Sequence, residues 1–199
     1  HISTIEGGFI STDDFQLYEL LLSLRSHGWD RDLSKHTQKV LQKDWNVSEF
    51  DAMYTFYYPG YNLRSTDLQA YIGLGQIDKL DGWGIQRQGN FQSYQTLIEN
   101  DYWKVKPQED SFISNFAYPI IHPNRDKIVK NLRKNNIEVR PMICGSMGTQ
   151  PFYVKKYGRL ELPNVSIIDK YGFYIPNHPK LTQSEIKLII NIVNEGVSK

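Results

Sequence analysis

The sequence is short of cysteine and of long apolar runs, and these two shortages exclude several classes of protein. Its single cysteine, Cys144, cannot form an internal disulfide, so a disulfide-stapled scaffold is excluded and a cytoplasmic location is expected. The longest apolar runs, such as Leu188-Ile189-Ile190, are only a few residues long, so we expect no membrane-spanning segment. The first residues do not form a charged and then apolar leader, so we also expect no signal peptide.

The sequence also lacks an excess of either charge. It has 23 Lys and Arg against 22 Asp and Glu, a net charge of +1, which argues against binding nucleic acid by bulk positive charge. The five histidines show no metal-ligand spacing, so no metal site is expected. What is present is 199 residues of ordinary globular composition with 26 aromatic residues (13 Tyr, 9 Phe, 4 Trp), enough for a sizeable core or a packed interface.

Hydrophobic spacing and capping residues predict mostly helices first, and then an alternation of strands and helices. We expect helices over residues 12–28, 65–80, 85–99, 124–135, 165–171 and 182–195, with a further short helix within 29–46. We expect strands over residues 9–12, 112–121, 137–142 and 173–176. Ser65 is the expected N-cap of the second helix, and Thr182 with Glu185 forms a capping box for the last. The fold class is therefore α/β, and the alternation after residue 112 predicts a small α/β layer.

Three segments could contact a ligand. Residues 3–8 could form a turn facing a ligand or, more simply, a structural turn. Residues 25–31 place two guanidinium groups and an imidazole around Gly28, which suits a diphosphate or sugar, although composition alone favours a helix end with surface charges. Residues 60–65 precede a helix N-terminus, where backbone N–H groups favour an anion and Asn62 and Arg64 add donors. The simpler reading of this last segment is a helix cap with a surface Arg.

Taken in order, these segments resemble the DegT/DnrJ/StrS family of vitamin-B6-dependent sugar enzymes. The resemblance rests on seven short stretches along the chain, and the ordered set is more specific than any single piece. They are Ser3 to Gly8, Asp13-Asp14, Leu24 to Gly28, Gly60 to Arg64 with Gln69 to Gly73, Ile137 to Pro141, Gln150 to Phe152, and Leu162 to Asn164.

The resemblance implies the type I aminotransferase fold, with residues 1–100 as the end of the cofactor-binding domain and its connecting helices and residues 101–199 as the small C-terminal α/β domain. It implies a homodimer with shared active sites and a nucleotide-linked keto-sugar as substrate. In the aminotransferases of the family, a Lys forms a Schiff base with pyridoxal 5'-phosphate. That position falls just before His1, so the catalytic residue is unknown and the chain is expected to be the later half of a family member.

One branch of the family has His at that position and uses pyridoxamine 5'-phosphate to remove the C3 hydroxyl of a 4-keto-6-deoxy sugar for surface polysaccharides. The family's aminotransferase pattern usually has Asn where this chain has His1, and Gly where it has Ile5. Both departures favour the dehydratase branch, as does the run from Arg25 to Trp29. We therefore expect a dehydratase, with a sugar aminotransferase as the alternative and a catalytically silent interaction module as a further one.

The resemblance also assigns expected roles to single residues. Asn62 is expected to contact the cofactor phosphate of the partner subunit, and His1 and Ser3 are expected to lie beside the cofactor. Arg64 is expected to support this loop or bind substrate, and Arg31 to reach the sugar nucleotide.

Overall fold

The computed structural model describes residues 2–198, and the chain divides between residues 78 and 79 into two compact units. We call residues 2–78 the N-terminal unit and residues from 79 onward the C-terminal unit. The division lies earlier than the boundary expected between residues 100 and 101, because helix α4 (Leu80–Leu97) packs with the C-terminal residues. Its Tyr94 ring lies 5.4 Å from that of Tyr118, and the Asn90 amide donates to the carbonyl of His178 (3.2 Å).

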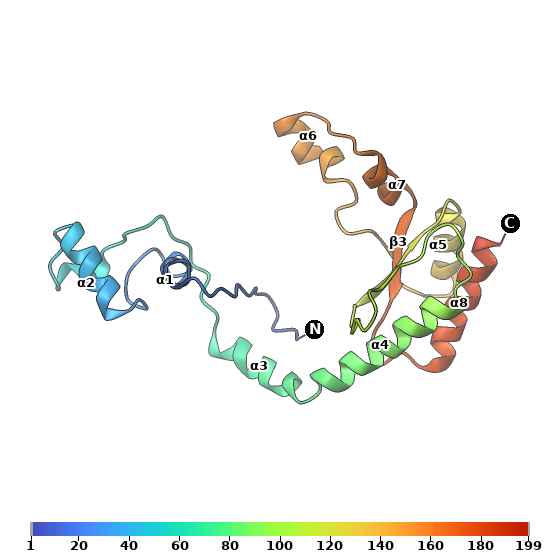
Figure 1. The fold of residues 1–199 in the computed structure, drawn as a ribbon, viewed down its shortest axis with the longest axis horizontal. Coiled ribbons are helices and arrows are strands. Elements are labelled where there is room, and N and C mark those ends of the chain that lie inside the picture. The colour runs from blue at the N-terminus through green and yellow to red at the C-terminus, as the bar shows by residue number, and fades with distance from the viewer. Residues whose placement is uncertain (1, 199) are drawn as a thin grey trace. The chain divides into compact units, whose positions relative to one another are not determined.

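The described part of the N-terminal unit is built from short helices and loops. In chain order these are α1 (Phe15–Leu24), α2 (Lys35–Asp44), the 3-10 turn η1 (Asp51–Tyr54) and α3 (Asp67–Ile77), coloured blue to green in Figure 1. Helix α1 lies within the helix expected over residues 12–28. It begins after Asp14, because the Asp14 carboxylate accepts hydrogen bonds from the N–H groups of Gln16 and Leu17. The strand expected over residues 9–12 is wrong. The segment is irregular, and without a neighbouring strand Phe9 is 97% exposed.

Helix α3 holds the opening segment of the N-terminal unit. Its N-cap is Thr66 rather than the expected Ser65, because Gln69 stands three residues after Thr66 and completes a capping box with it. The side chain of Gln69 also donates to the carbonyl of Glu6 (2.6 Å), and Gln76 makes two hydrogen bonds with the backbone of Ser3 (2.9 and 2.6 Å). The helix ends at Ile77 and does not continue to Leu80 as expected.

The C-terminal unit is a three-stranded sheet covered by helices (Figure 1). Strand β3 (Gly172–Pro176) lies in the centre and pairs antiparallel with β1 (Ala117–Ile121) on one side and β2 (Arg140–Pro141) on the other. Between and after the strands come α5 (Arg125–Lys134), the 3-10 turn η2 (Met147–Thr149), α6 (Pro151–Tyr157), α7 (Pro163–Tyr171) and α8 (Gln183–Val197). The predicted alternation of strands and helices is confirmed, although the first two strands are shorter than expected and α6 was not predicted.

The core of the described structure lies in the C-terminal unit. Phe173 and Ile175 of β3, Ile120 of β1 and Val193 of α8 are almost fully buried and belong to one cluster with residues of α4 and α5. Helix α8 is placed by the predicted capping box, in which Thr182 and Glu185 bind each other's backbone N–H groups. The N-terminal unit differs sharply, because Leu33 and Ala52 are its only buried hydrophobic residues among those described.

Within residues 2–198, no helix has the length and apolar character needed to cross a membrane.

Candidate functional site

Two loops that the sequence analysis singled out separately are hydrogen-bonded to each other in the N-terminal unit. The His27 N–H donates to the carbonyl of Tyr61 (2.7 Å), and the Leu63 N–H donates to the carbonyl of Arg25 (2.9 Å). Ser26 and Asn62 are therefore opposite each other in a short antiparallel bridge. We call residues 25–31 the first loop and residues 57–64 the second loop.

A contact between two glycines brings these loops together. A Cβ built on Gly60 would lie 2.1 Å from the backbone nitrogen of Gly28, and one built on Gly28 would lie 1.8 Å from the carbonyl oxygen of Tyr58. Gly28 also has a φ of +86°, a conformation that other residues rarely adopt. Only glycine at both positions lets the backbones approach so closely, and this approach fixes the position of Asn62.

Asn62 and Arg64 present unused donors. Both residues are exposed, and neither side chain makes a hydrogen bond or ion pair within residues 2–198. An amide and a guanidinium on a rigid backbone can bind the oxygens of a phosphate. The N-terminus of α3 offers fewer free N–H groups to an anion than expected, because the capping box already uses the N–H groups of Thr66 and Gln69.

Arg31 is held in place by aromatic side chains. Its guanidinium carbon lies 3.7 Å from the centroid of the Trp29 ring, and its Nη2 donates to the carbonyl of Met53 (2.7 Å). Trp29 is fixed in turn by Phe56, whose ring stacks on it at 5.8 Å, and by a hydrogen bond from its Nε1 to the hydroxyl of Ser26 (2.7 Å). The Arg31 charge is therefore pre-oriented next to the first loop.

Two further candidate residues, Ser3 and His1, lie outside these two loops. The backbone of Ser3 is bound to α3 through Gln76, and its exposed hydroxyl makes no hydrogen bond within residues 2–198. His1 lies outside the described residues. No hydrogen bond or ion pair within those residues joins Ser3, Arg31, Asn62 and Arg64 to one another, so what the structure brings together is the two loops.

The sequence analysis missed a buried carboxylate that fixes the first two helices. Glu19 of α1 accepts hydrogen bonds from the backbone N–H of Ser34 (2.5 Å) and from the hydroxyl of Thr37, at the start of α2. Burial alone raises the pKa of Glu19, but these hydrogen bonds outweigh it and hold the pKa below its ordinary value. In the sequence Glu19 stands among the leucines of α1, on the apolar face of that helix. No other feature of the sequence indicated this role. Within residues 2–198, no three His, Cys, Asp or Glu side chains cluster as metal ligands would.

Comparisons with known proteins identify the family of the chain. Residues 1–194 match the profile of the DegT/DnrJ/EryC1/StrS aminotransferase family. A GDP-4-keto-6-deoxy-D-mannose 3-dehydratase of Yersinia pseudotuberculosis is 30% identical over 203 residues, which cover 98% of this chain and 51% of the relative. The chain thus spans about half the length of the curated relatives that it matches.

Solved structures show the same fold. The Escherichia coli GDP-4-keto-6-deoxy-D-mannose-3-dehydratase with bound hydrated PLP matches with a TM-score of 0.74 and 25% identity, over 92% of this chain and 48% of that one. The sugar aminotransferase CalS13 from Micromonospora echinospora matches with a TM-score of 0.80 at 18% identity, over 98% of this chain and 49% of that one. The expected α/β fold of the type I aminotransferases is confirmed.

Proposed function

The chain belongs to the DegT/DnrJ/EryC1/StrS aminotransferase family. We propose that it acts as a vitamin-B6-dependent C3-dehydratase. The proposed substrate is a nucleotide-linked 4-keto-6-deoxy sugar used in surface polysaccharide biosynthesis. The observation that carries the proposal is the 30% identity to a GDP-4-keto-6-deoxy-D-mannose 3-dehydratase along 98% of the chain. His1 and Ile5, which stand where the family's aminotransferases usually have Asn and Gly, support the same choice.

The residues of the N-terminal unit fit a phosphorylated cofactor. Asn62 offers a neutral donor and Ser3 a hydroxyl, and both side chains are exposed without a partner among the described residues. In this proposal Asn62 holds the phosphate of pyridoxamine or pyridoxal 5'-phosphate bound in the partner subunit, and Ser3 and His1 lie beside the cofactor. When bound, the cofactor supplies an electron sink that allows the bond between C3 and its hydroxyl oxygen to break.

The two arginines are assigned to the substrate. Arg64 and Arg31 would pair with the diphosphate that links the sugar to its nucleoside, because guanidinium groups bind phosphate oxygens through paired hydrogen bonds. The stacking of Arg31 on Trp29 lowers the entropy lost when it binds. The residue that moves the proton at the sugar is not assigned to any position of this chain.

A homodimer and a cytoplasmic location complete the proposal. The N-terminal unit exposes many large apolar side chains, with Phe9, Phe50 and Tyr71 exposed by 97%, 77% and 75%. A surface of this kind supports burial in an assembly. We assign residues 1–100 to the end of the cofactor-binding domain and its connecting helices, and residues 101–199 to the small C-terminal α/β domain. The single cysteine suits a reducing compartment such as the cytoplasm.

The role of Asn62 is tested by the affinity of the full-length protein for pyridoxamine 5'-phosphate. Replacing Asn62 by Ala removes one hydrogen bond to a charged group, so the dissociation constant should rise about tenfold or more. Asn164→Ala is the matched control, since Asn164 is exposed in the C-terminal unit and its side chain makes no hydrogen bond to a described residue. Unchanged affinity in Asn62→Ala would show that the assignment of this residue is wrong.

The second candidate function is that of a sugar aminotransferase, which the name of the family favours. The reaction product distinguishes this activity from that of a dehydratase. With GDP-4-keto-6-deoxymannose and pyridoxamine 5'-phosphate, a dehydratase gives a sugar that has lost its C3 oxygen and gained no nitrogen. A transaminase gives a sugar that keeps this oxygen and gains nitrogen. Mass spectrometry of the sugar nucleotide distinguishes the two products.

A further inference from the structure

A long loop joins α4 to β1 in the C-terminal unit. Residues 98–116 contain no helix or strand. Connections of this length without secondary structure are uncommon in compact domains, and when they are ordered they are usually functional. The amide of Asn100, which is 3% exposed, donates to the carbonyl of Ile121 in β1 (3.1 Å), and the amide of Gln95 in α4 donates to the carbonyl of Val105 (2.8 Å). The start of the loop is therefore anchored to both neighbouring elements.

This anchored segment surrounds an open depression of about 780 Å³. Two aromatic side chains line it, Trp103 and Tyr102, which are 38% and 46% exposed. The Tyr102 ring is held by edge contacts with the rings of His122 (6.1 Å between centroids) and Tyr171 (6.2 Å), whereas the Trp103 ring contacts no other ring within residues 2–198. An aromatic surface is therefore available to a planar ligand. The full lining is Asn100, Asp101, Tyr102, Trp103, Lys104 and Lys106.

Two lysines stand beside this aromatic surface. Lys104 and Lys106 both line the depression, and neither forms an ion pair with a described residue. Val105, between them, packs against the core cluster and does not line the depression. The lining holds a single carboxylate, that of Asp101, so it carries one net positive charge. The depression thus combines an exposed indole with a small excess of cations.

We propose that this depression binds a mononucleotide. The Trp103 indole can stack on the base, and the two ammonium groups can bind oxygens of the phosphate. Its volume lies within the range of small-molecule sites, roughly 300–1,000 Å³. A bare polyphosphate would leave the indole unused and would be repelled by Asp101. Because every base has a face that can stack, the proposal favours no particular base. It does not depend on the proposed function.

The test measures the binding of adenosine 5'-monophosphate to the full-length protein by isothermal titration calorimetry. Trp103→Ala removes the stacking surface, so the dissociation constant should rise about tenfold. Trp45→Ala is the matched control, because Trp45 is an exposed tryptophan of the N-terminal unit (67%), and it should leave the constant unchanged. Arg64→Ala should also leave it unchanged, which separates this depression from the proposed substrate site.

Adenosine, which lacks the phosphate, tests the role of the lysines. It should bind the unmodified protein about tenfold more weakly than adenosine 5'-monophosphate, and added sodium chloride should weaken only the binding of the nucleotide. Lys104→Met combined with Lys106→Met should make the two ligands bind equally. This double variant changes no aromatic side chain, so it keeps the proposal testable if Trp103→Ala does not fold.

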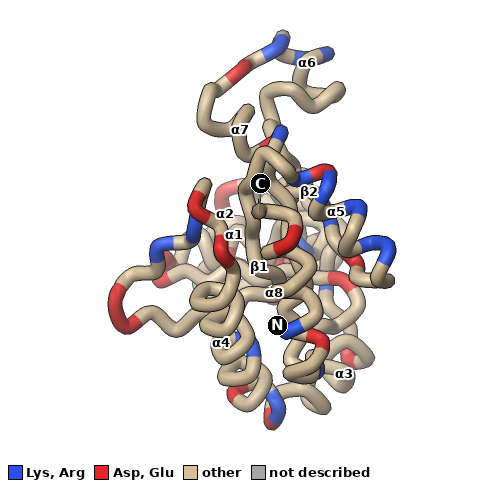
Figure 2. The backbone as a smooth tube through the Cα atoms, turned by 90° about the vertical axis from the view of Figure 1, so that its right-hand side faces the viewer, with Lys and Arg blue, Asp and Glu red and all other residues tan. Residues whose placement is uncertain are grey.

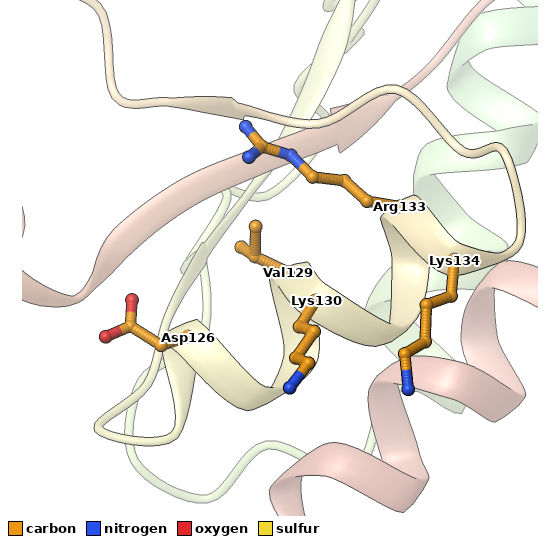
Figure 3. Close-up of a pocket in the computed structure, with 5 residues that line it drawn as sticks. All are labelled: Asp126, Val129, Lys130, Arg133 and Lys134. Carbon is orange, nitrogen blue, oxygen red and sulfur yellow. The ribbon is translucent and has the colours of Figure 1, made fainter.

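A second group of lysines provides the control for general attraction of anions. Figure 3 shows an open depression of about 570 Å³ on α5, lined by Asp126, Val129, Lys130, Arg133 and Lys134. Figure 2 shows how lysine and arginine gather along this helix, which makes it the competing place for a loosely bound anion. This lining has no aromatic ring. Lys130→Met combined with Lys134→Met should therefore keep the full affinity for adenosine 5'-monophosphate.

Three results would overturn the proposal. The first is a failure of the unmodified protein to bind adenosine 5'-monophosphate. The second is equal affinity in Trp103→Ala and Trp45→Ala. The third is a loss of affinity in the α5 double variant that matches the loss in the variant of Lys104 and Lys106, which would show attraction by charge alone.

Discussion

Single residues decide the geometry of the two loops in the N-terminal unit. Gly28 and Gly60 meet backbone to backbone, and the hydrogen bonds on either side of Ser26 and Asn62 depend on that approach. Neither glycine could be identified from the sequence as part of a pair, because they are far apart in the chain and each fits an ordinary turn alone. The donors Asn62 and Arg64 could be predicted, whereas the partner that holds them could not.

Gly60→Ala is expected to destabilise the N-terminal unit by about 1–3 kcal/mol, because the added methyl group would overlap the backbone of Gly28. Gly75→Ala is the matched control. Its Cβ would meet no atom within 4 Å, and in α3 it should stabilise the helix by up to about 1 kcal/mol. Urea unfolding followed by circular dichroism measures both. Equal stability of the two variants would contradict the glycine contact.

Glu19 predicts how the stability of the N-terminal unit depends on pH. Its folded pKa lies below the ordinary value of 4.5, so the unfolded chain takes up the proton more readily. The contribution of Glu19 is therefore complete above about pH 4.5 and is lost as the pH falls through the lowered folded pKa. Glu19→Gln should be less stable than the unmodified protein at neutral pH, and the gap should narrow in acid. A gap that stays constant from pH 7 to pH 3 would show that the carboxylate charge has no part in joining α1 to α2.

At the scale of elements, the sequence predicted helices better than strands. Helix ends are set by local caps, so the starts at Asp14 and Thr182 were predictable, and Thr66 could have been, since Gln69 stands three residues after it. Strand lengths depend on the partner. The strand expected over residues 112–121 shrinks to Ala117–Ile121, which pair with all five residues of β3. Of the strand expected over residues 137–142, only Arg140 and Pro141 pair with β3.

The attachment of the opening segment to α3 gives a prediction at this scale. Gln76→Ala removes both hydrogen bonds to the Ser3 backbone, so the Ser3 amide should exchange with deuterium faster, while the amides of α3 itself should change little. Gln86→Ala, at an exposed position of α4 with no side-chain hydrogen bond to a described residue, is the control. Equal exchange at Ser3 in both variants would mean that Gln76 does not anchor the segment.

At the scale of the whole molecule, the two units differ in how much apolar surface they bury. The core cluster of the C-terminal unit joins its helices and its sheet, whereas the N-terminal unit has two buried hydrophobic residues among those described. The sequence indicated the small α/β layer because strands and helices alternate locally. It did not indicate the division after residue 78, because the assignment of α4 depends on distant partners such as His178.

Hydrogen exchange of the complete protein should reveal this difference. We expect the amides of α4, β1, β3 and α8 to exchange last, and those of α1, α2 and α3 to exchange through smaller and more frequent openings. Mass spectrometry of peptic peptides resolves the two sets. Uniform protection along the chain would contradict the difference in core size.

The central position of β3 also has a consequence for synthesis. While residues up to 171 leave the ribosome, β1 and β2 have no strand between them, and the buried face of α8 has not yet been translated. The sheet can close only after residues 172–176 emerge, and the core only after Val193. The C-terminal unit therefore folds late in translation, and a stalled or truncated product ending before β3 should be cleared by proteases.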